Sequence, residues 1–319
     1  MRDLKLVFLI VLCVSLDFVQ SEKLPFKVIS RYKKINDNSM DKEKISSGKI
    51  QILSYNTWGL PIELSGHDHE RRFKFMPESI LETKSDIIAL QETFNPILRN
   101  KLLSVLPSQY YTYSDYRCTR TIIPFVYMDC YGGLMTLSSF PITEEEFFLF
   151  PSHKSCSLIE KIGSKGFLVS QIQHGDENIL VINTHLYAGN DKKSEEIRMQ
   201  QLKYLYNVML NFEKYTRDKV ILLGDFNIQH PDIACSEVYD FIVGTMGFID
   251  SKPNIDQRDY TIDLTTNKYV PSKEPCAKLD YIFMKSNTHK PINVVSQSRA
   301  MTSNKTLSDH YGWQACLKI

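Results

Sequence analysis

Acidic, amide and imidazole side chains follow apolar runs at several places in this 319-residue chain. The clearest case is the segment VILLGDFNI at 220–228, where an apolar run ends in Asp225 and Asn227. Side chains alternate along an extended strand, so these two point the same way while Phe226 points into the protein. A carboxylate and an amide at one strand end can orient a phosphate and an attacking water. A strand followed by an ordinary Asx turn is the alternative.

The same pattern occurs at other apolar runs, and it predicts a single site. The polar residues at the strand ends are Asn56, Glu92, His185, Asp225, Asn227, Asp280, Asp309 and His310. Burying such groups costs stability unless they pair with each other or with a metal. Each residue alone is compatible with an ordinary turn, but their shared position at strand ends favours one common site.

The elements that must position these residues alternate between strands and helices. Apolar runs predict strands at 50–55, 86–90, 132–137, 166–172, 179–183, 220–228, 279–283 and 313–317. Apolar residues at helical spacing predict amphipathic helices over Arg71–Lys84 and Glu195–Tyr215. This order is typical of a layered α/β protein. Residues 22–49 form a polar, lysine-rich lead, and 50–319 is expected to be one domain.

The composition is that of a globular protein, with 43% hydrophobic and 24% charged residues and a net charge of +1. That charge gives no long-range attraction for nucleic acid, although it does not exclude a nuclease. Residues 1–21 resemble a cleavable signal peptide, because Arg2 and Lys5 precede an apolar run over Leu6–Leu16. The run is roughly half the ~20 residues that a bilayer-spanning helix needs. We expect a secreted protein; an uncleaved anchor is the alternative.

Six cysteines follow this segment: Cys118, Cys130, Cys156, Cys235, Cys276 and Cys316. Their spacing does not match a zinc site. An even set in an exported chain favours disulfides, but the spacing does not select one pairing. The 132–137 strand is preceded by Cys118 and Cys130 and followed by Cys156. We therefore predict that Cys156 forms a disulfide with either Cys118 or Cys130. Such a bridge would contribute on the order of 3 kcal/mol.

Eight segments resemble the endonuclease/exonuclease/phosphatase superfamily, and within it the neutral sphingomyelinases. They are SYNTWGLP (54–61), DIIALQETF (86–94), GGLMTLSSFPI (132–142), KGFLVSQI (165–172), NTHLYAG (183–189), LLGDFNI (222–228), LDYIF (279–283) and LSDHYG (307–312). They occur in the family order. GDFN and SDH are shared across the superfamily and specify only phosphoester hydrolysis, whereas NTWGLP, KGF and THLYAG favour sphingomyelinases.

This resemblance implies a DNase I-like four-layer α/β sandwich, in which helices flank two packed mixed β-sheets. It implies a secreted, Mg²⁺-dependent phosphodiesterase that hydrolyses sphingomyelin to ceramide and phosphocholine by in-line attack of water. The implied partners are sphingomyelin or a related phospholipid and a peripheral membrane surface. We expect a monomer and no nucleic-acid partner.

The resemblance also implies roles for the residues at the strand ends. Glu92, Asn56 and Asp309 would bind Mg²⁺ or hold its water shell, since a hard cation prefers oxygen ligands. His310 would be the general base, with Asp280 fixing its tautomer. The remaining roles are Asp225 and Asn227 orienting water and phosphate, His185 stabilising the transition state, and Lys165 adding a positive charge.

One departure from the family bears on membrane contact. Secreted bacterial sphingomyelinases are known for an aromatic-tipped hairpin before the SDH motif, but residues 284–308 contain no Phe, Tyr or Trp. The aromatic cluster at 110–131 or the run Phe147–Phe150 are candidates to replace it, unless these residues are core.

Two other functions remain open on the sequence alone. One is a secreted DNase-like nuclease or a phosphoinositide phosphatase, although a nuclease would need basic groups along a groove. Only weak clusters such as Arg117 and Arg120 are present. The other is a non-catalytic homologue that binds a host molecule or forms pores.

Overall fold

The structure is a computed structural model. It describes residues 47–60, 68–105, 111–112, 117–123, 126–151, 163–212, 215, 218–230, 236–274, 276–302 and 306–319. The expected signal peptide, all but the last three residues of the polar lead, and Cys156 lie outside these residues. Within the described part of the chain, no helix is both long and apolar enough to cross a bilayer.

The first sheet has six strands in the order β13-β14-β1-β2-β6-β3. These are β1 (Lys49–Asn56), β2 (Ile87–Gln91), β3 (Tyr111–Thr112), β6 (Met135–Ser138), β13 (Asn293–Ala300) and β14 (Gly312–Lys318). β1 is parallel to β2 and antiparallel to β14. The carboxyl ends of β1 and β2 therefore lie beside the segment that enters β14.

The second sheet also has six strands, in the order β11-β12-β10-β9-β8-β7. These are β7 (Ile142–Leu149), β8 (Gly166–His174), β9 (Glu177–His185), β10 (Lys219–His230), β11 (Ile249–Asp250) and β12 (Lys278–Ser286). β9 and β10 are parallel, and their register pairs His185 with Asp225. β12 is antiparallel to β10 and pairs Asp280 with the same Asp225.

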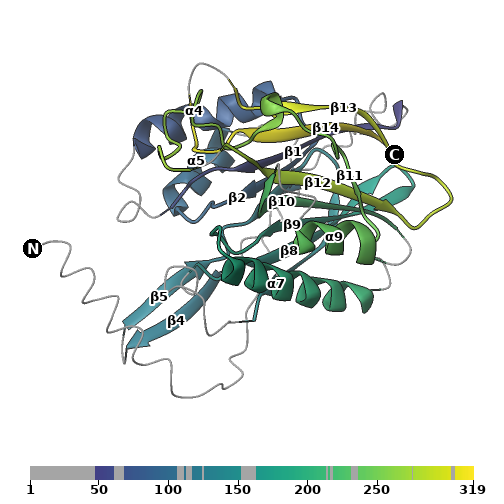
Figure 1. The fold of residues 1–319 in the computed structure, drawn as a ribbon, viewed down its shortest axis with the longest axis horizontal. Helices are drawn as coiled ribbons and strands as arrows, with labels where there is room; N and C mark the ends of the chain where they lie inside the picture. The colour runs from purple at the N-terminus through teal and green to yellow at the C-terminus, as the bar shows by residue number, and fades with distance from the viewer. Residues whose placement is uncertain are drawn as a thin grey trace, which may run out of the picture.

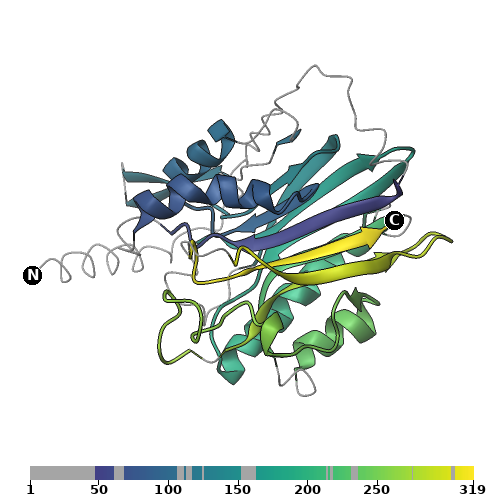
Figure 2. The same cartoon turned by 90° about the horizontal axis from the view of Figure 1, so that it is seen from above.

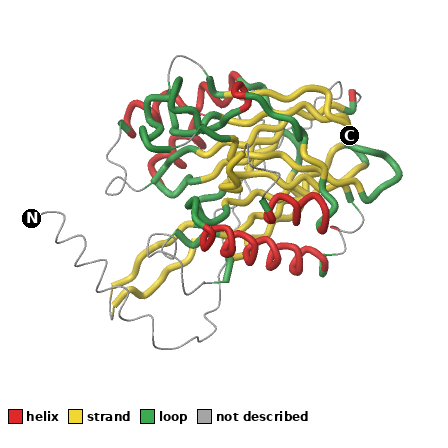
Figure 3. The backbone as a smooth tube through the Cα atoms, viewed as in Figure 1, coloured by secondary structure: helices red, strands yellow, loops and turns green. Residues whose placement is uncertain are grey.

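Helices cover the outer face of each sheet, so the predicted four-layer α/β sandwich is confirmed (Figures 1 and 2). α4 (His69–Glu82) and α5 (Pro96–Val105) cover the first sheet, and α7 (Lys192–Leu210) and α9 (Glu237–Asp240) cover the second. A π-helical turn, η2 (Phe241–Thr245), continues α9, and a short 3₁₀ turn, η3 (Gln257–Asp259), precedes β12. Figure 3 shows the strands between the two helical layers.

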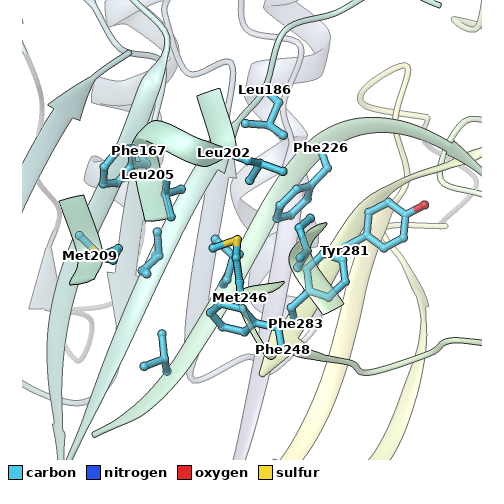
Figure 4. Close-up of a cluster of buried hydrophobic side chains, with 14 of the residues drawn as sticks. Phe167, Leu186, Leu202, Leu205, Met209, Phe226, Met246, Phe248, Tyr281 and Phe283 are labelled. Carbon is cyan, nitrogen blue, oxygen red and sulfur yellow. The ribbon is translucent and has the colours of Figure 1, made fainter. Parts of the chain in front are cut away.

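Clusters of buried apolar side chains hold the layers together. The central cluster joins the sheets through residues such as Ile52 of β1 and Ile221 of β10. In the cluster under α7, Leu202 and Leu205 lie beside Phe167 and Phe226 (Figure 4). Each fully buried Leu or Phe side chain contributes about 1.5–3 kcal/mol relative to an exposed one. Consecutive apolar residues of a central strand such as β10 pack alternately into these two clusters, so both faces of the strand are covered.

The predicted strands and both long helices are present, with shifted ends. The helix expected over 195–215 is α7, which begins after Asp191 because that side chain accepts a hydrogen bond from the Ser194 amide. It ends at Leu210, earlier than the apolar spacing predicted. The run Phe147–Phe150 is core: Phe147 and Phe150 are buried, and Phe148 stacks on Phe167. Packing therefore excludes this run as the membrane contact.

A separate two-stranded sheet of β4 (Arg117–Ile123) and β5 (Val126–Tyr131) extends away from the sandwich (Figure 1). Its backbone register makes Cys118 and Cys130 cross-strand partners. The predicted pairing of Cys156 stays a prediction. Among the cysteines whose side chains the structure describes, Cys276 and Cys316 form no disulfide.

A buried pair of amides links the sheets directly behind the strand ends. Gln91 Nε2 donates to Asn183 Oδ1 at 2.8 Å, and Asn183 Nδ2 donates to the Leu90 and Met135 carbonyls at 3.1 Å. We predict that Asn183→Ala destabilises the protein by about 1–3 kcal/mol, because the Gln91 amide would lose a buried partner. Urea unfolding would measure this. A midpoint and slope equal to the wild-type values would contradict it.

Candidate active site

The site lies where the core between the two sheets changes from apolar to polar. Ile52 belongs to this core, and Asn56 lies four residues further along β1 on the same face. The same period of two leads from Val181 to His185 in β9 and from Ile221 to Asp225 in β10. It also leads from Ile282 back to Asp280 in β12. Strand alternation therefore directs these polar side chains into one space.

Asn56 bridges two carboxylates that come from different sheets. Its Nδ2 donates to Glu92 Oε1 at 3.1 Å and to Asp225 Oδ2 at 2.9 Å. Its Oδ1 accepts a hydrogen bond from the Trp58 amide at 2.9 Å. The side-chain amide of Asn56 therefore holds Glu92 in place, and the hydrogen bond from the Trp58 amide orients its Oδ1.

Two histidines flank Asp225. His185 Nε2 lies 3.5 Å from Asp225 Oδ2 and 3.9 Å from Glu92 Oε1. His310 Nε2 lies 3.7 Å from the same Asp225 oxygen, and His310 Nδ1 lies 2.8 Å from Asp280 Oδ2. The carboxylate of Asp280 favours a proton on Nδ1, which leaves Nε2 of His310 facing the site.

Asn227 and Lys165 meet at one backbone carbonyl beside this cluster. Asn227 Nδ2 and Lys165 Nζ each lie 3.1 Å from the Leu186 carbonyl oxygen and donate to it. The backbone N–H of Asn227 donates to Asp225 Oδ1 at 3.0 Å. This hydrogen bond forms the Asx turn that was the alternative interpretation of the sequence. Phe226 points away into the core under α7, as predicted.

The loop that carries Asp309 and His310 is held by residues that the sequence did not single out. Asn267 Nδ2 donates to the carbonyls of Ser308 and Asp309 at 2.9 and 3.0 Å. The Ser308 hydroxyl donates to the Asn56 carbonyl at 2.7 Å. Asn267 is buried in a loop without apolar periodicity, so no sequence signal pointed to it.

Unusual backbone conformations are concentrated at this rim. Trp58, Glu92 and Asn227 have positive φ angles of 48°, 54° and 52°. Non-glycine residues in this region cost of order 1–3 kcal/mol each and are typical of functional sites. Gly224 has φ +144°, and a Cβ there would lie 1.9 Å from the Thr184 carbonyl oxygen. Only glycine lets β10 pass β9 closely enough to place Asp225.

The site concentrates negative charge in a buried space. Burial, together with the charge of Asp309, raises the pKa of Glu92 to about 7. Burial also raises the pKa of Asp225 to about 6, even though His310 opposes that rise. Burial disfavours the charged form of His310, but Asp280 and Asp225 outweigh it and hold the His310 pKa well above its usual value. The pKa of His185 is well below its usual value because the ring is buried and lies near Lys165.

The residues present suit a divalent cation. Glu92 Oε2 is buried and has no hydrogen-bond partner among the described residues. With the buried Asp225 and the partly buried Asp309, Glu92 gives three clustered carboxyl groups, which a hard cation such as Mg²⁺ would stabilise. Ligand atoms of Asp225, Asp280 and His310 also lie within 4.8 Å of one another. Asp280 Oδ2 and His310 already share a hydrogen bond, and the buried oxygens beside them that lack a partner in the described structure are Glu92 Oε2 and Asp280 Oδ1.

The chain belongs to the endonuclease/exonuclease/phosphatase family, whose model matches residues 53–310. Sphingomyelinase C of Bacillus cereus is 26% identical over 167 residues, which are 50% of this chain and 49% of that protein. Phospholipase C of Staphylococcus aureus is 24% identical over 290 residues, which are 82% of each chain.

Solved structures show the same fold. SmcL has a TM-score of 0.65 at 19% identity, and the match covers 85% of this chain and 99% of the SmcL chain. Beta toxin from Staphylococcus aureus has a TM-score of 0.64 at 20% identity, and the match covers 83% of this chain and 99% of the toxin chain. TDP2 from D. rerio, complexed with a single strand DNA product, has a TM-score of 0.64 at 18% identity, covering 85% and 99%. The predicted DNase I-like architecture is thus confirmed.

Proposed function

We propose that this protein is a secreted, Mg²⁺-dependent phosphodiesterase that hydrolyses sphingomyelin to ceramide and phosphocholine. The observation that carries the hydrolytic part is the pairing of His310 with Asp280 at 2.8 Å, next to the carboxylate of Asp225. An imidazole oriented by one carboxylate would be suited to accept a proton from water once a bound cation offsets the carboxylate charges that raise its pKa. Hydrolysis of a phosphodiester needs such a base together with groups that hold the phosphate.

The remaining residues have complementary proposed roles. Asp225 and Asn227 would orient the attacking water and a phosphate oxygen, and His185 would donate a hydrogen bond to the charged transition state. Glu92 and Asp309 would hold Mg²⁺, with Asn56 fixing Glu92. The cation supplies positive charge that offsets the charge of the phosphate oxygens. A structure of beta toxin carries bound magnesium ions, which supports this choice of metal.

The lipid substrate is supported by sequence rather than by geometry. The NTWGLP, KGF and THLYAG segments resemble sphingomyelinases, and curated relatives are named sphingomyelinase C and phospholipase C. The net charge of +1 gives no general attraction for nucleic acid. Peripheral membrane contact by a monomer is proposed for the region 110–131, which includes the β4–β5 sheet that extends from the sandwich (Figure 1).

A nuclease is the second candidate, because TDP2 with bound DNA product has a TM-score as high as that of beta toxin. A substrate panel separates the two. We predict that the purified mature protein with Mg²⁺ releases phosphocholine from sphingomyelin vesicles and leaves plasmid DNA and a phosphoinositide intact. DNA cleavage without phosphocholine release would overturn the lipid assignment. Absence of turnover on every phosphoester would instead favour the non-catalytic alternative.

A further inference from the structure

Arg72 on α4 is completely buried and donates hydrogen bonds to three backbone carbonyls. Its Nη2 donates to Thr57 and Trp58 at 2.6 and 2.9 Å, and its Nε donates to Leu307 at 2.6 Å. The first two carbonyls directly follow Asn56. The third lies two residues before Asp309. One guanidinium therefore ties together the two segments that lead to these residues.

The same guanidinium also fixes a strained residue. Its central carbon lies 4.5 Å from the centroid of the Trp58 ring, and the Trp58 backbone has a φ of +48°. The Trp58 amide donates to the side-chain oxygen of Asn56. The stacking contact and the hydrogen bond to the Trp58 carbonyl oppose relaxation of this conformation, and so maintain the orientation of the Asn56 amide.

We propose that Arg72 is a positioning residue that sets the relative placement of Asn56 and Asp309, and through them the geometry of the cation site. This inference rests on the proposed Mg²⁺ site. α4 is anchored in the core by Phe73 and Met76, so Arg72 approaches both segments from a rigid element. The Ser308 hydroxyl adds a second link between them through the Asn56 carbonyl.

If Arg72 acted on the cation site only through its charge, neutralising it would strengthen Mg²⁺ binding, whereas a positioning role predicts weaker binding. The positive charge of Arg72 interacts with the carboxylates of Asp309 and Glu92, and it would repel a cation that these carboxylates bind. Neutralising Arg72, as in Arg72→Met, would then tighten Mg²⁺ binding. A positioning role predicts weaker binding even when the charge is kept, because the single ammonium of lysine cannot reproduce the planar fork of arginine.

Two variants serve as matched controls. Arg71 is the neighbouring residue on α4, and it donates to Tyr269 and to the Thr306 carbonyl but not to the carbonyls that follow Asn56. Arg71→Lys therefore changes the same residue type on the same helix. Lys219→Met removes the ion pair between the buried Lys219 and the partly exposed Glu177 at the opposite end of the sheet. It tests whether loss of stability alone weakens cation binding.

The experiment is titration of Mg²⁺ by calorimetry, with thermal unfolding and steady-state hydrolysis of sphingomyelin vesicles measured on each variant. Arg72→Lys is expected to weaken Mg²⁺ binding about 10-fold or more, as for other residues that orient metal ligands. The turnover number should fall while KM for the lipid stays unchanged. Arg71→Lys should bind Mg²⁺ like the wild type, and Lys219→Met should lose thermal stability but retain Mg²⁺ affinity.

Three outcomes separate this inference from the proposed function. Wild-type affinity in Arg72→Lys, or tighter binding in Arg72→Met, would overturn the positioning role while the cation site stands. No Mg²⁺ uptake by the wild type would overturn the cation site itself and the Arg72 role with it. If the Arg72 variants do not fold, Trp58→Leu removes the ring against which the Arg72 guanidinium packs. Unchanged Mg²⁺ affinity in that variant would also overturn the inference, because Arg72 is argued to hold Asn56 through the Trp58 conformation.

Discussion

Replacing His310 with alanine is expected to lower the turnover number by at least ~10², the low end of measured general-base contributions. The physical reason is that Nε2 of His310 faces Asp225 and the site, while Nδ1 is held by Asp280 at 2.8 Å. Without the imidazole, a proton from the attacking water has no oriented acceptor. Phosphocholine release from sphingomyelin vesicles at saturating Mg²⁺ measures the effect.

Asp280→Asn is the companion variant. It preserves the volume of the side chain but removes the carboxylate that selects the tautomer of His310, so we expect a loss of similar size. Thermal unfolding checks that both variants fold, because His310 lies at the rim and supports little of the core. A folded His310→Ala protein that turns over at the wild-type rate would rule out this histidine as the base.

Removal of divalent cations is expected to abolish activity, and Mg²⁺ should restore it. Glu92→Gln should then raise the Mg²⁺ concentration needed for half-maximal activity sharply, because it replaces a buried carboxylate with a neutral amide of similar size. The unpaired oxygen of Glu92 is the atom we expect to face the cation. Titration of activity with Mg²⁺ after treatment with EDTA measures both effects.

The matched control is Glu145→Gln on β7, where the carboxylate accepts a hydrogen bond from the Ser170 hydroxyl and is remote from the strand ends. Its Mg²⁺ requirement should equal that of the wild type. Full hydrolysis in excess EDTA would exclude the metal assignment, and an unchanged Mg²⁺ requirement in Glu92→Gln would exclude Glu92 as a ligand.

The sequence predicted the strands of the sandwich well because each buried strand is a continuous apolar run. β13 was missed because most of it is exposed at the edge of its sheet, so it carries no apolar period. β7 was missed for a related reason, since three consecutive glutamates at 144–146 interrupt its apolar pattern. Edge strands depend on backbone pairing with a neighbour, and backbone pairing leaves little trace in residue type.

The clustering of Asn56, His185, Asp225 and Asp280 was also predictable, because they continue the inward-facing positions of the central strands. What could not be predicted is how they are held. Asn56 was expected near the metal, but only coordinates show that its amide oxygen is taken by the Trp58 backbone. The sequence does contain an indication of Arg72, because a charged residue lies beside Phe73 and Met76 on the apolar face of α4. Its partners are backbone carbonyls, and these have no residue-type signature.

The pairing of β1 with β14 determines when during synthesis this protein can become active. Asn56 is made early, whereas the Ser308 hydroxyl that contacts its carbonyl lies 252 residues later in the chain. β1 stays without its antiparallel neighbour until Gly312–Lys318 has emerged. Contacts so distant in sequence form slowly. The site between the two sheets is therefore among the last parts of the nascent chain to close, because Asp309 and His310 are made after every other residue of the site.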